Sequence, residues 1–597
     1  MTKGNFIARS LTVCACLCLI LAVFTGCCTS ASLSSTVADT VVYGKIYTAN
    51  SDQEYVEAFA VKDGRYIYVG SREGAEKYVK EGVTEVLDYS DGFVMPGATE
   101  GHGHYIMSAA MSAMDLIRVT PTIESLLDFA KEVCERYPSS TLYLTYGWDN
   151  VELTPIKGTI NIREKLDEIC SDKPMVLIDN TGHNIFMNSK TIELAGLTPE
   201  TEIEGGTYSK DENGNLLGLA SDVAMNYVMS KVVQPANFMT AESFAVAVEN
   251  GQNKLHADGY TYYLDAYTSY FGESAFIGIS EYDKTKGLEI CMEATYKIDP
   301  FEEDLDACIE EVVSYKNKYT TKRFNPDCIK LFADGECVES MSGWVLAPYK
   351  DGSYGTQVWK DEEMDYLVKT ANENGISVHV HASGDAATEQ VVNAMVKADD
   401  VKKEGVKNSL GHCFGLTDET MDLMAEYGIA SATNIGWRNY VKSFSGLDGV
   451  EYIEDRFSSF DWYIHGYPLA SQLERGIVMA SSTDYPSNGF GPTDILNIIE
   501  IAVNGTMDME ASAYPEGYEI GAFSSSEFIT LTEALDVMTI NGAKLMGIDG
   551  ERGSIEVGKY ADFVYLDKDI SSIPADSIHT ANVSKVYFEG NEVYSLN

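Results

Sequence analysis

The chain has 597 residues, 45% hydrophobic and 22% charged, a globular composition that excludes a small disulfide scaffold, a disordered chain and a collagen-like chain. Lys and Arg number 43 against 91 Asp and Glu, which gives a formal net charge of −48. A field of this sign repels phosphates and anionic lipid headgroups and argues against nucleic acid as a partner.

Residues 1–26 predict an export signal. Lys3 and Arg9 precede an apolar run over residues 11–24 that contains no acidic residue, which is the pattern of a secretory signal peptide. The run is too short and too close to the first residue for a comfortable membrane-spanning helix. We therefore expect an exported protein.

The end of this run, FTGC over residues 24–27, resembles a bacterial lipoprotein processing box in which Cys27 becomes the lipidated first residue. Phe replaces the usual Leu, and Cys28 offers a second candidate. Residues 27–37 are rich in Ser, Thr and Ala, as expected of a tether. The expectation is a lipid anchor on Cys27 that holds the protein to a membrane. A plain signal peptide or an uncleaved anchor is the alternative.

Both ends of the remaining chain have the sequence pattern of a small β domain. Over residues 38–98, and again over residues 550–597, apolar runs alternate with Gly or Asp turns, which is typical of antiparallel strands. The recurrence at both ends predicts that the two segments build one β-sandwich domain around the central segment.

The central segment, residues 99–549, alternates strand-like runs with helical patterns. Eight runs that each close on polar residues predict an α/β fold of the (β/α)8 TIM-barrel type. A stretch of about residues 119–259 separates the first run from the second and predicts an insertion after the first barrel strand. The runs are GATEGHGH (97–104), YTYYLDAY (260–267), LEICMEATY (288–296), CIKLFADG (328–335), ISVHVHASGD (376–385), SLGHCF (409–414), IASATNIGW (429–437) and IVMASSTDY (477–485).

Histidines gather at the ends of these runs. Side chains two apart on a strand share a face, so His102 and His104 can both point into the barrel mouth and bind one ion. In the fifth run His381 is favoured over His379, because the deeper residue faces packed core. His412 ends the next run. Asp484, which ends the last run, adds a carboxylate to this set, and the combination predicts a metal site.

Several short motifs resemble the metal-dependent amidohydrolases, and within them the branch called amidohydrolase family 3. VMPGATEGHGH is similar to the Gly-x-x-Asp-x-His-x-His element, with Glu100 for Asp, and IKLFADG, HVHASGDAA, GHCF and SSTDYP follow in family order. GHNIFMNSKTIELAGL (182–197) and the segment over residues 539–567 are also similar. The resemblance covers roughly residues 38–595.

The resemblance implies a set of metal ligands. It makes His102 and His104 ligands of one metal, and His381 and His412 ligands of the other. Lys330 matches a lysine that becomes carbamylated and bridges two metals. The ions would be divalent, one or two in number, with zinc expected.

The roles implied for these residues fit the chemistry. Two cations would lower the pKa of a water molecule and polarise the scissile carbonyl. Asp484, which matches an aspartate that binds metal and moves the proton, would accept the proton of that water and pass it to the leaving nitrogen. Lys330 could instead pair with Asp334 or lie at the surface, although its place inside the apolar run CIKLF disfavours a surface position.

The resemblance also supplies candidates around the metal. His183 matches a position that faces the substrate, and Trp148 and Asp149 occupy a similar loop, so all three are candidates for substrate binding. Loop packing is the alternative for His183. Asp334 and Asp385 each follow a strand run and could orient metal ligands, with turn capping as the alternative.

Two departures from the family bear on the substrate. Many relatives carry Arg near the sixth-strand His and after the Asp-Gly of the fourth strand, whereas this chain has NSLGHCF and DGECVESMSG. The missing Arg weakens any case for an anionic substrate. Asp222 lies where relatives often carry Glu.

The sequence thus predicts an exported, lipid-anchored, metal-dependent hydrolase that cleaves a carbon–nitrogen bond other than a peptide bond, most simply the amide of a small molecule. A non-catalytic solute-binding lipoprotein is one alternative. A deaminase or isomerase on the same metal site is another. The identity of the substrate stays open, as does a homo-oligomeric state.

Overall fold

The computed structural model describes residues 37–596, apart from residues 150–152, 154–159, 237–238, 339, 442–455, 459–465, 488–490, 508–519 and 523. The predicted export segment and Cys27 lie outside the described residues. No helix within the described ranges combines the length and the apolar composition needed to cross a membrane.

The centre of the molecule is an eight-stranded sheet of consecutive parallel strands, which confirms the predicted barrel. The strands are β5 (Ala98–Gly103), β12 (Tyr260–Asp265), β13 (Cys291–Lys297), β14 (Phe324–Phe332), β15 (Ser377–Ala382), β16 (Asn408–His412), β17 (Ala430–Thr433) and β19 (Met479–Ser481). Each predicted run overlaps one strand, although β13, β14 and β16 extend beyond their runs.

The first and last barrel strands meet at a glycine. A Cβ atom on Gly101 of β5 would lie 2.7 Å from the carbonyl oxygen of Ser481 in β19, so only glycine allows the two backbones to approach this closely. The Asp484 N–H also donates to the His102 carbonyl over 2.8 Å. The strand ends that carry His102 and Asp484 are therefore held side by side.

Helices connect and cover the barrel strands. They include α3 (Tyr105–Ser112), α9 (Ala241–Asp258), α10 (Glu273–Thr285), α11 (Leu305–Tyr319), α12 (Asp361–Glu373), α13 (Asp385–Lys397), α14 (Asp418–Tyr427), α17 (Leu469–Glu474), α18 (Ile495–Asn504), α19 (Leu531–Met538) and α20 (Ile540–Leu545).

The sequence of α12 shows why these segments are helical. Its first turn carries acidic residues over 361–363, whose charge interacts favourably with the helix N-terminus. Its buried side chains recur at the three- and four-residue spacing that forms one apolar face: Met364, Leu367, Val368 and Ala371. α14 then shows how such a helix ends, at Gly428 with a φ of 63°. That left-handed conformation favours glycine and turns the chain into β17.

Segments from both chain ends build a second sheet, which confirms the predicted terminal β domain. Its seven strands lie in the order β23-β22-β21-β4-β1-β2-β3. One pair departs from the expected antiparallel pattern, because β1 and β4 run parallel. The strands are β1 (Thr40–Tyr47), β2 (Tyr55–Lys62), β3 (Arg65–Gly70), β4 (Glu85–Pro96), β21 (Phe563–Leu566), β22 (Val583–Phe588) and β23 (Asn591–Ser595), and α2 (Arg72–Glu76) packs nearby.

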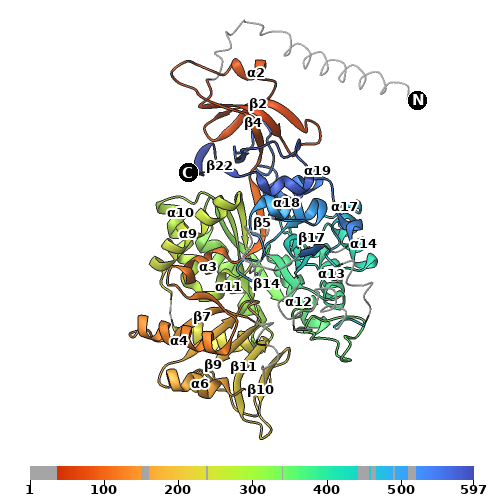
Figure 1. Cartoon of the computed structure of the whole chain (residues 1–597). Coiled ribbons are helices and arrows are strands. Elements are labelled where there is room, and N and C mark those ends of the chain that lie inside the picture. The colour runs from red at the N-terminus through yellow and green to blue at the C-terminus, as the bar shows by residue number, and fades with distance from the viewer. Residues whose placement is uncertain are drawn as a thin grey trace, which may run out of the picture.

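The insertion after the first barrel strand is a third, six-stranded sheet in the order β10-β11-β9-β8-β7-β6. Figure 1 shows it at the opposite end of the barrel from the terminal sheet. Its elements are β6 (Ile117–Thr120), α4 (Ile123–Arg136), β7 (Tyr143–Trp148), α6 (Ile162–Ile169), β8 (Met175–Asp179), β9 (Asn184–Met187), α7 (Ser189–Leu194), β10 (Gly206–Lys210), β11 (Leu216–Asp222) and α8 (Val223–Val228). A separate two-stranded sheet pairs β18 (Asn439–Val441) with β20 (Ile520–Ala522).

A partly buried ionic cluster joins the terminal sheet to the barrel. Glu589, which follows β22, accepts hydrogen bonds from Lys322 over 2.7 Å and Arg323 over 2.8 Å, just before the start of β14. Arg552 pairs with both Glu589 and Asp562. Burial alone would raise the pKa of Glu589, but its hydrogen bonds to Arg323, Lys322 and Arg552 outweigh that effect and lower the pKa to about 2.

Candidate metal centre

Three side chains from the two ends of the barrel sheet converge on one point. His102 lies on β5, His104 follows that strand, and Asp484 follows β19. Asp484 Oδ1 lies 3.1 Å from His104 Nε2 and 3.5 Å from His102 Nε2. The three candidate ligand atoms all lie within 4.8 Å of one another, which is close enough to hold one ion.

Lys330 and His379 fix the position of the His102 ring from two sides. Lys330 Nζ lies 3.1 Å from His102 Nε2, and His379 Nε2 lies 2.7 Å from His102 Nδ1. His379 is fully buried and its other ring nitrogen contacts Ser409 Oγ over 2.7 Å. The deeper histidine of β15 therefore supports His102, while His381 faces the cavity described below.

His381 and His412 lie at the ends of neighbouring strands, with ring centroids 4.2 Å apart. Each ring has one nitrogen already engaged. His381 Nε2 lies 3.0 Å from the Gly335 carbonyl oxygen, and His412 Nδ1 lies 2.9 Å from the Asn434 side-chain oxygen. Nδ1 of His381 and Nε2 of His412 are thus the nitrogens left to bind an ion, an arrangement in which a second hydrogen bond sets the orientation of each ring.

Burial sets the protonation state of these groups. It lowers the pKa of His102, His379, His381 and His412 well below the usual range, so the imidazoles are neutral and can act as ligands. Burial also lowers the pKa of Lys330 to about 7. A substantial fraction of Lys330 is therefore a neutral amine near neutral pH.

The backbone at the site is held in an unusual conformation. His412, Cys413 and Asp484 have positive φ angles of 72°, 55° and 58°. Non-glycine residues adopt this region only when surrounding contacts enforce it, and such residues concentrate at functional sites. Glu100 contributes to those contacts, because its Oε1 accepts hydrogen bonds from the N–H groups of His102 and Thr483, both over 3.0 Å. Burial raises the pKa of Glu100 to about 8.

A further observation indicates that His102, His104 and Asp484 fit a divalent ion. Asp484 Oδ1 is buried and accepts no hydrogen bond from the described residues, although two imidazole nitrogens lie close to it. A buried carboxylate oxygen without a donor is costly. A cation held between Asp484, His102 and His104 would satisfy all three atoms.

A cavity opens between the barrel mouth and the inserted sheet, directly beside these residues. It contains about 730 Å³ of space free of protein atoms, including its opening to solvent. The described residues that line it are His102, His104, Met107, Tyr146, Ile178, Thr181, Gly182, His183, Asp222, Val223, Met225, Asn226, Tyr267, Tyr270, Phe332, Asp334, Val358, His381, His412, Asp484 and Ser487.

His183 reaches this cavity from the inserted sheet and pairs with Asp222 at the end of β11. His183 Nδ1 lies 2.9 Å from Asp222 Oδ1, which leaves Nε2 to face a ligand. Burial alone would lower the pKa of His183, but the hydrogen bond and the charge of Asp222 outweigh it and raise the pKa to about 9. The Asp222 N–H also donates to the His183 carbonyl over 2.7 Å, so the two residues form one rigid unit.

The structure does not bring the other two predicted substrate contacts to the cavity. Trp148 is 1% exposed, stacks on Phe186 at 4.2 Å and donates from Nε1 to the Leu177 carbonyl over 2.8 Å, so it belongs to the core of the inserted sheet. The Asp149 N–H donates to the Thr120 carbonyl over 3.1 Å. Asp149 does not line the cavity.

The two predicted orienting aspartates differ. Asp334 lines the cavity, its Oδ1 lies 3.7 Å from His381 Nε2, and its carboxylate accepts from the N–H groups of Trp344, Ser383 and Gly384. Burial raises the pKa of Asp334 to about 7. Asp385 starts α13, and its Oδ1 accepts from the N–H of Leu346 over 2.8 Å, so it fixes a loop.

A second buried lysine beside the site was not among the predicted residues. Lys297 ends β13 and lies opposite Lys330 in the pairing of β13 with β14. Its Nζ lies 2.9 Å from Asp299 Oδ1 and 4.9 Å from the ring centroids of both Tyr267 and Phe332. Its position in the sequence could have identified it as a site residue, because Lys297 is the first residue after the predicted run over 288–296.

The chain is similar to a known family and to known proteins. A model of the amidohydrolase family matches residues 85–594. The protein YtcJ of Bacillus subtilis (strain 168) is 27% identical over 565 residues, which cover 92% of this chain and 98% of that protein. The N-substituted formamide deformylase of Arthrobacter pascens is 24% identical over 570 residues, 92% of this chain and 97% of the relative.

The fold is also found among solved structures. The crystal structure of an uncharacterized metal-dependent hydrolase from Pyrococcus horikoshii OT3 matches with a TM-score of 0.67 and 20% identity, over 90% of this chain and 99% of that one.

Proposed function

Because this chain belongs to the amidohydrolase family, we propose that it is a metal-dependent hydrolase that cleaves a carbon–nitrogen bond other than a peptide bond, in the amide of a small molecule. The observation that carries the proposal is the convergence of Asp484 with His102 and His104 beside a cavity that opens to solvent. A relative named for acting on N-substituted formamides supports the choice of an amide.

His102 Nε2, His104 Nε2 and Asp484 Oδ1 would hold one ion, and His381 Nδ1 and His412 Nε2 would hold a second. A divalent ion in such a position lowers the pKa of water and polarises a carbonyl. Nitrogen and carboxylate ligands of this kind suit zinc. Lys330, whose Nζ lies next to His102, would bridge the two positions once carbamylated.

Asp484 would move the proton. Asp484 lines the cavity, and with Oδ1 assigned to the ion its second carboxylate oxygen would accept a proton from the attacking water. The same oxygen can return that proton to the nitrogen of the leaving amine, which cannot depart as an anion.

His183 would contact the carbonyl of the substrate. Asp222 holds Nδ1, so Nε2–H is the donor that remains for a ligand. A fixed donor aimed at an oxygen that gains negative charge stabilises the transition state more than the bound substrate. The rigid pairing with Asp222 supports this role over loop packing.

The test combines metal analysis with a substrate screen. Purified protein, loaded with zinc or another divalent ion, is analysed for metal content and incubated with a panel of N-acyl and N-formyl amines. We expect bound metal and release of a free amine. Metal-replete protein that hydrolyses no member of the panel, but binds small molecules, would favour a solute-binding protein. Release of ammonia from an amino-substituted ring would favour a deaminase, and an isomeric product would favour an isomerase.

We also propose that the protein is exported and anchored through a lipid on Cys27, on the basis of the charged and apolar pattern of residues 1–26. Mass spectrometry of the natural N-terminus, combined with partition between membrane and soluble fractions, tests this. A mature chain that begins after Cys28 and stays soluble would contradict it.

A further inference from the structure

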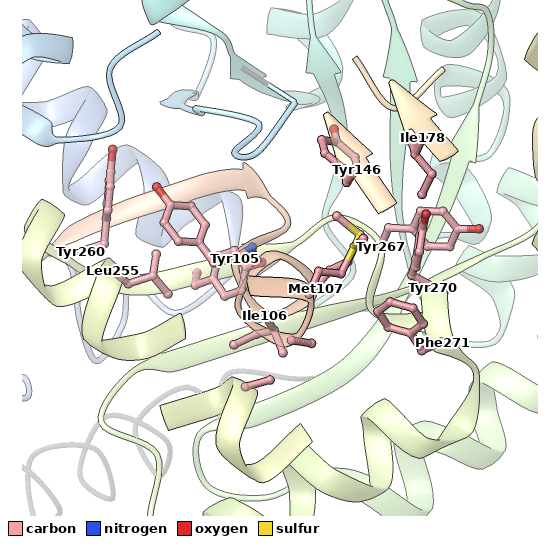
Figure 2. Close-up of a cluster of buried hydrophobic side chains, with 14 of the residues drawn as sticks. Tyr105, Ile106, Met107, Tyr146, Ile178, Leu255, Tyr260, Tyr267, Tyr270 and Phe271 are labelled. Atoms are coloured by element: carbon pink, nitrogen blue, oxygen red, sulfur yellow. Dashed lines mark hydrogen bonds between the residues drawn. The ribbon is translucent and has the colours of Figure 1, made fainter. Parts of the chain in front are cut away.

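One side of the cavity is formed by apolar and aromatic side chains from separate parts of the chain. They are Met107 of α3, Tyr146 of β7, Ile178 of β8, and Tyr267 and Tyr270 from the segment after β12, and we call them the aromatic wall. All five are less than a tenth exposed. Figure 2 shows them gathered around one space, where the inserted sheet approaches the barrel.

Tyr270 carries a polar atom with nothing to bind among the described residues. Its ring meets the ring of Tyr267 edge-on at 5.0 Å, and its hydroxyl is buried without a hydrogen-bond partner in that part of the chain. The neighbouring hydroxyl differs, because Tyr146 Oη contacts Ser487 Oγ over 2.8 Å. A buried hydroxyl without a partner costs free energy. A ligand in the cavity could supply the missing partner.

The charges around the aromatic wall disfavour an anionic ligand. No Lys or Arg occurs among the described residues that line the cavity. Of the three lining carboxylates, Asp222 and Asp334 already have donors, from His183 and from backbone N–H groups, and Asp484 is assigned to the metal ion. The cationic side chains nearby are already paired, His183 with Asp222 and Lys297 with Asp299. An anionic group at the aromatic wall would therefore lose its hydration without gaining an unpaired cationic partner.

A cationic ligand is disfavoured for a different reason. The Lys297 ammonium already lies 4.9 Å from the rings of Tyr267 and Phe332, two of the aromatic side chains that line the cavity. Those two rings therefore already interact with a cation, and Asp299 is paired with the same lysine. A second cation would find no unpaired carboxylate at the aromatic wall.

We propose that the aromatic wall is the binding subsite for an uncharged, apolar substituent such as an aryl ring, and that the Tyr270 hydroxyl hydrogen-bonds one polar atom on that substituent. The subsite rests on the proposed function in one respect, that the amide of the same molecule lies beside Asp484. The substrate class is then a neutral N-substituted amide with one aromatic or bulky aliphatic group.

A matched series of N-(2-arylethyl)acetamides tests the subsite. The aryl group is phenyl, 4-hydroxyphenyl, 4-carboxyphenyl or 4-(aminomethyl)phenyl, so that only the charge and polarity at the ring change. Binding to the metal-loaded protein is measured by calorimetry and hydrolysis by amine release. We expect both charged probes to bind at least about tenfold more weakly than the phenyl probe. Equal or tighter binding of either charged probe would overturn the proposal.

Tyr270→Phe removes the hydroxyl and keeps the ring that forms part of the aromatic wall, so it tests the hydroxyl alone. The variant should weaken binding of the 4-hydroxyphenyl probe about fivefold and leave the phenyl probe unchanged, because one neutral hydrogen bond is lost. Tyr282→Phe is the control, since Tyr282 is a buried tyrosine of α10 that does not line the cavity. An unchanged ratio of the two affinities in Tyr270→Phe would remove the hydroxyl from the subsite.

The two measurements also separate this proposal from the proposed function. If the neutral probes bind best but none is hydrolysed, the subsite stands and amide hydrolysis fails. If the amides are hydrolysed without regard to ring charge, the hydrolase stands and the subsite fails.

Discussion

At the scale of the residue, Asp484 combines two properties that rarely coincide. Its carboxylate lies within 3.5 Å of two imidazole nitrogens, yet its Oδ1 accepts no hydrogen bond from the described residues. Asp484→Asn removes the charge and the proton acceptor while keeping the shape. We expect kcat to fall by about 10² or more, because general acid–base catalysis alone contributes roughly 10² to 10⁴.

The control for this change is Asp365→Asn on α12, where the carboxylate pairs with Lys397 at the surface. That variant should keep normal turnover. Steady-state kinetics and metal analysis on both proteins check the prediction. Activity of Asp484→Asn within about threefold of the parent, at full metal content, would remove Asp484 from the mechanism.

Lys330 offers a second test at this scale. An ammonium beside divalent ions would be repelled, whereas a neutral amine can take up carbon dioxide and become an anionic bridge. Burial lowers the pKa of Lys330 to about 7, which favours the neutral form. Lys330→Ala should lose metal and activity together, and acetate or propionate should restore part of both.

Native mass spectrometry gives an independent readout, since the parent protein should carry the mass of one added carbon dioxide. Lys397→Ala, which removes a surface lysine, should change neither metal content nor mass beyond the substitution itself. Retention of two metals and near-normal turnover in Lys330→Ala would favour a mononuclear site without a carbamate.

At the scale of the element, strand β16 leaves space for two histidines of other barrel strands, His379 of β15 and His102 of β5. A Cβ atom on Gly411 would lie 2.4 Å from His102 Nδ1 and 3.2 Å from His379 Nε2. Both rings are buried and hydrogen-bonded, so neither can move aside without breaking a contact. Gly411→Ala should therefore displace His102 and lower metal occupancy.

We expect Gly411→Ala to cost about 1–3 kcal/mol of stability, the usual range for overpacking, while the fold is kept. Gly550→Ala is the matched control, because a Cβ there has no atom within 4 Å. Metal titration followed by circular dichroism distinguishes the two variants. Normal metal affinity in Gly411→Ala would show that the His102 ring has room to move.

The elements also show what the sequence could predict. Each barrel strand overlaps a predicted run, because a strand covered on both faces needs a continuous apolar segment. The polar residues that end those runs lie together for the same reason, since parallel strands deliver their carboxyl ends to one edge. The parallel pairing of β1 with β4 was not visible, because strand direction depends on connections outside the local pattern.

Contacts between elements far apart in the chain could not be predicted. The pairing of His183 with Asp222 depends on β9 and β11 lying side by side in the inserted sheet. The burial of Trp148 against Phe186 depends on the same sheet. The sequence around these residues does not indicate either contact. Trp148 was predicted to bind substrate only because of its position in a loop.

At the scale of the whole molecule, the cluster around Glu589 couples the terminal sheet to the barrel. The pKa of Glu589 is about 2, below its ordinary value of 4.5. A carboxylate with a lowered pKa stabilises the fold above its unfolded pKa, and this contribution disappears as the pH falls through the folded pKa. The pH window is therefore about 4.5 to 2, and the contribution at neutral pH is about 1–3 kcal/mol, because solvent screens the pairs with Lys322 and Arg323.

Glu589→Gln should lower the free energy of unfolding at neutral pH. The difference in free energy between this variant and the parent should shrink as the pH approaches 2. Urea denaturation of both proteins at several pH values checks this. Glu592→Gln is the control, because Glu592 pairs with Lys585 in a partly exposed position, where ion pairs contribute little. A stability difference between Glu589→Gln and the parent that does not change with pH would contradict the assignment.

The pairing of β4 with β21 sets an order for folding. Phe93 and Pro96 of β4 are opposite Leu566 and Phe563 of β21, more than four hundred and fifty positions later in the chain. While the chain is being synthesised, one edge of β4 therefore stays unpaired until the whole barrel has been made. Contacts of such long range form slowly, and an open strand edge can pair with another chain. The barrel strands pair mostly with their neighbours in sequence, so the barrel can assemble first. A nascent chain of this protein would thus contain its histidine cluster before its terminal sheet is complete, and it would need protection from aggregation during that interval.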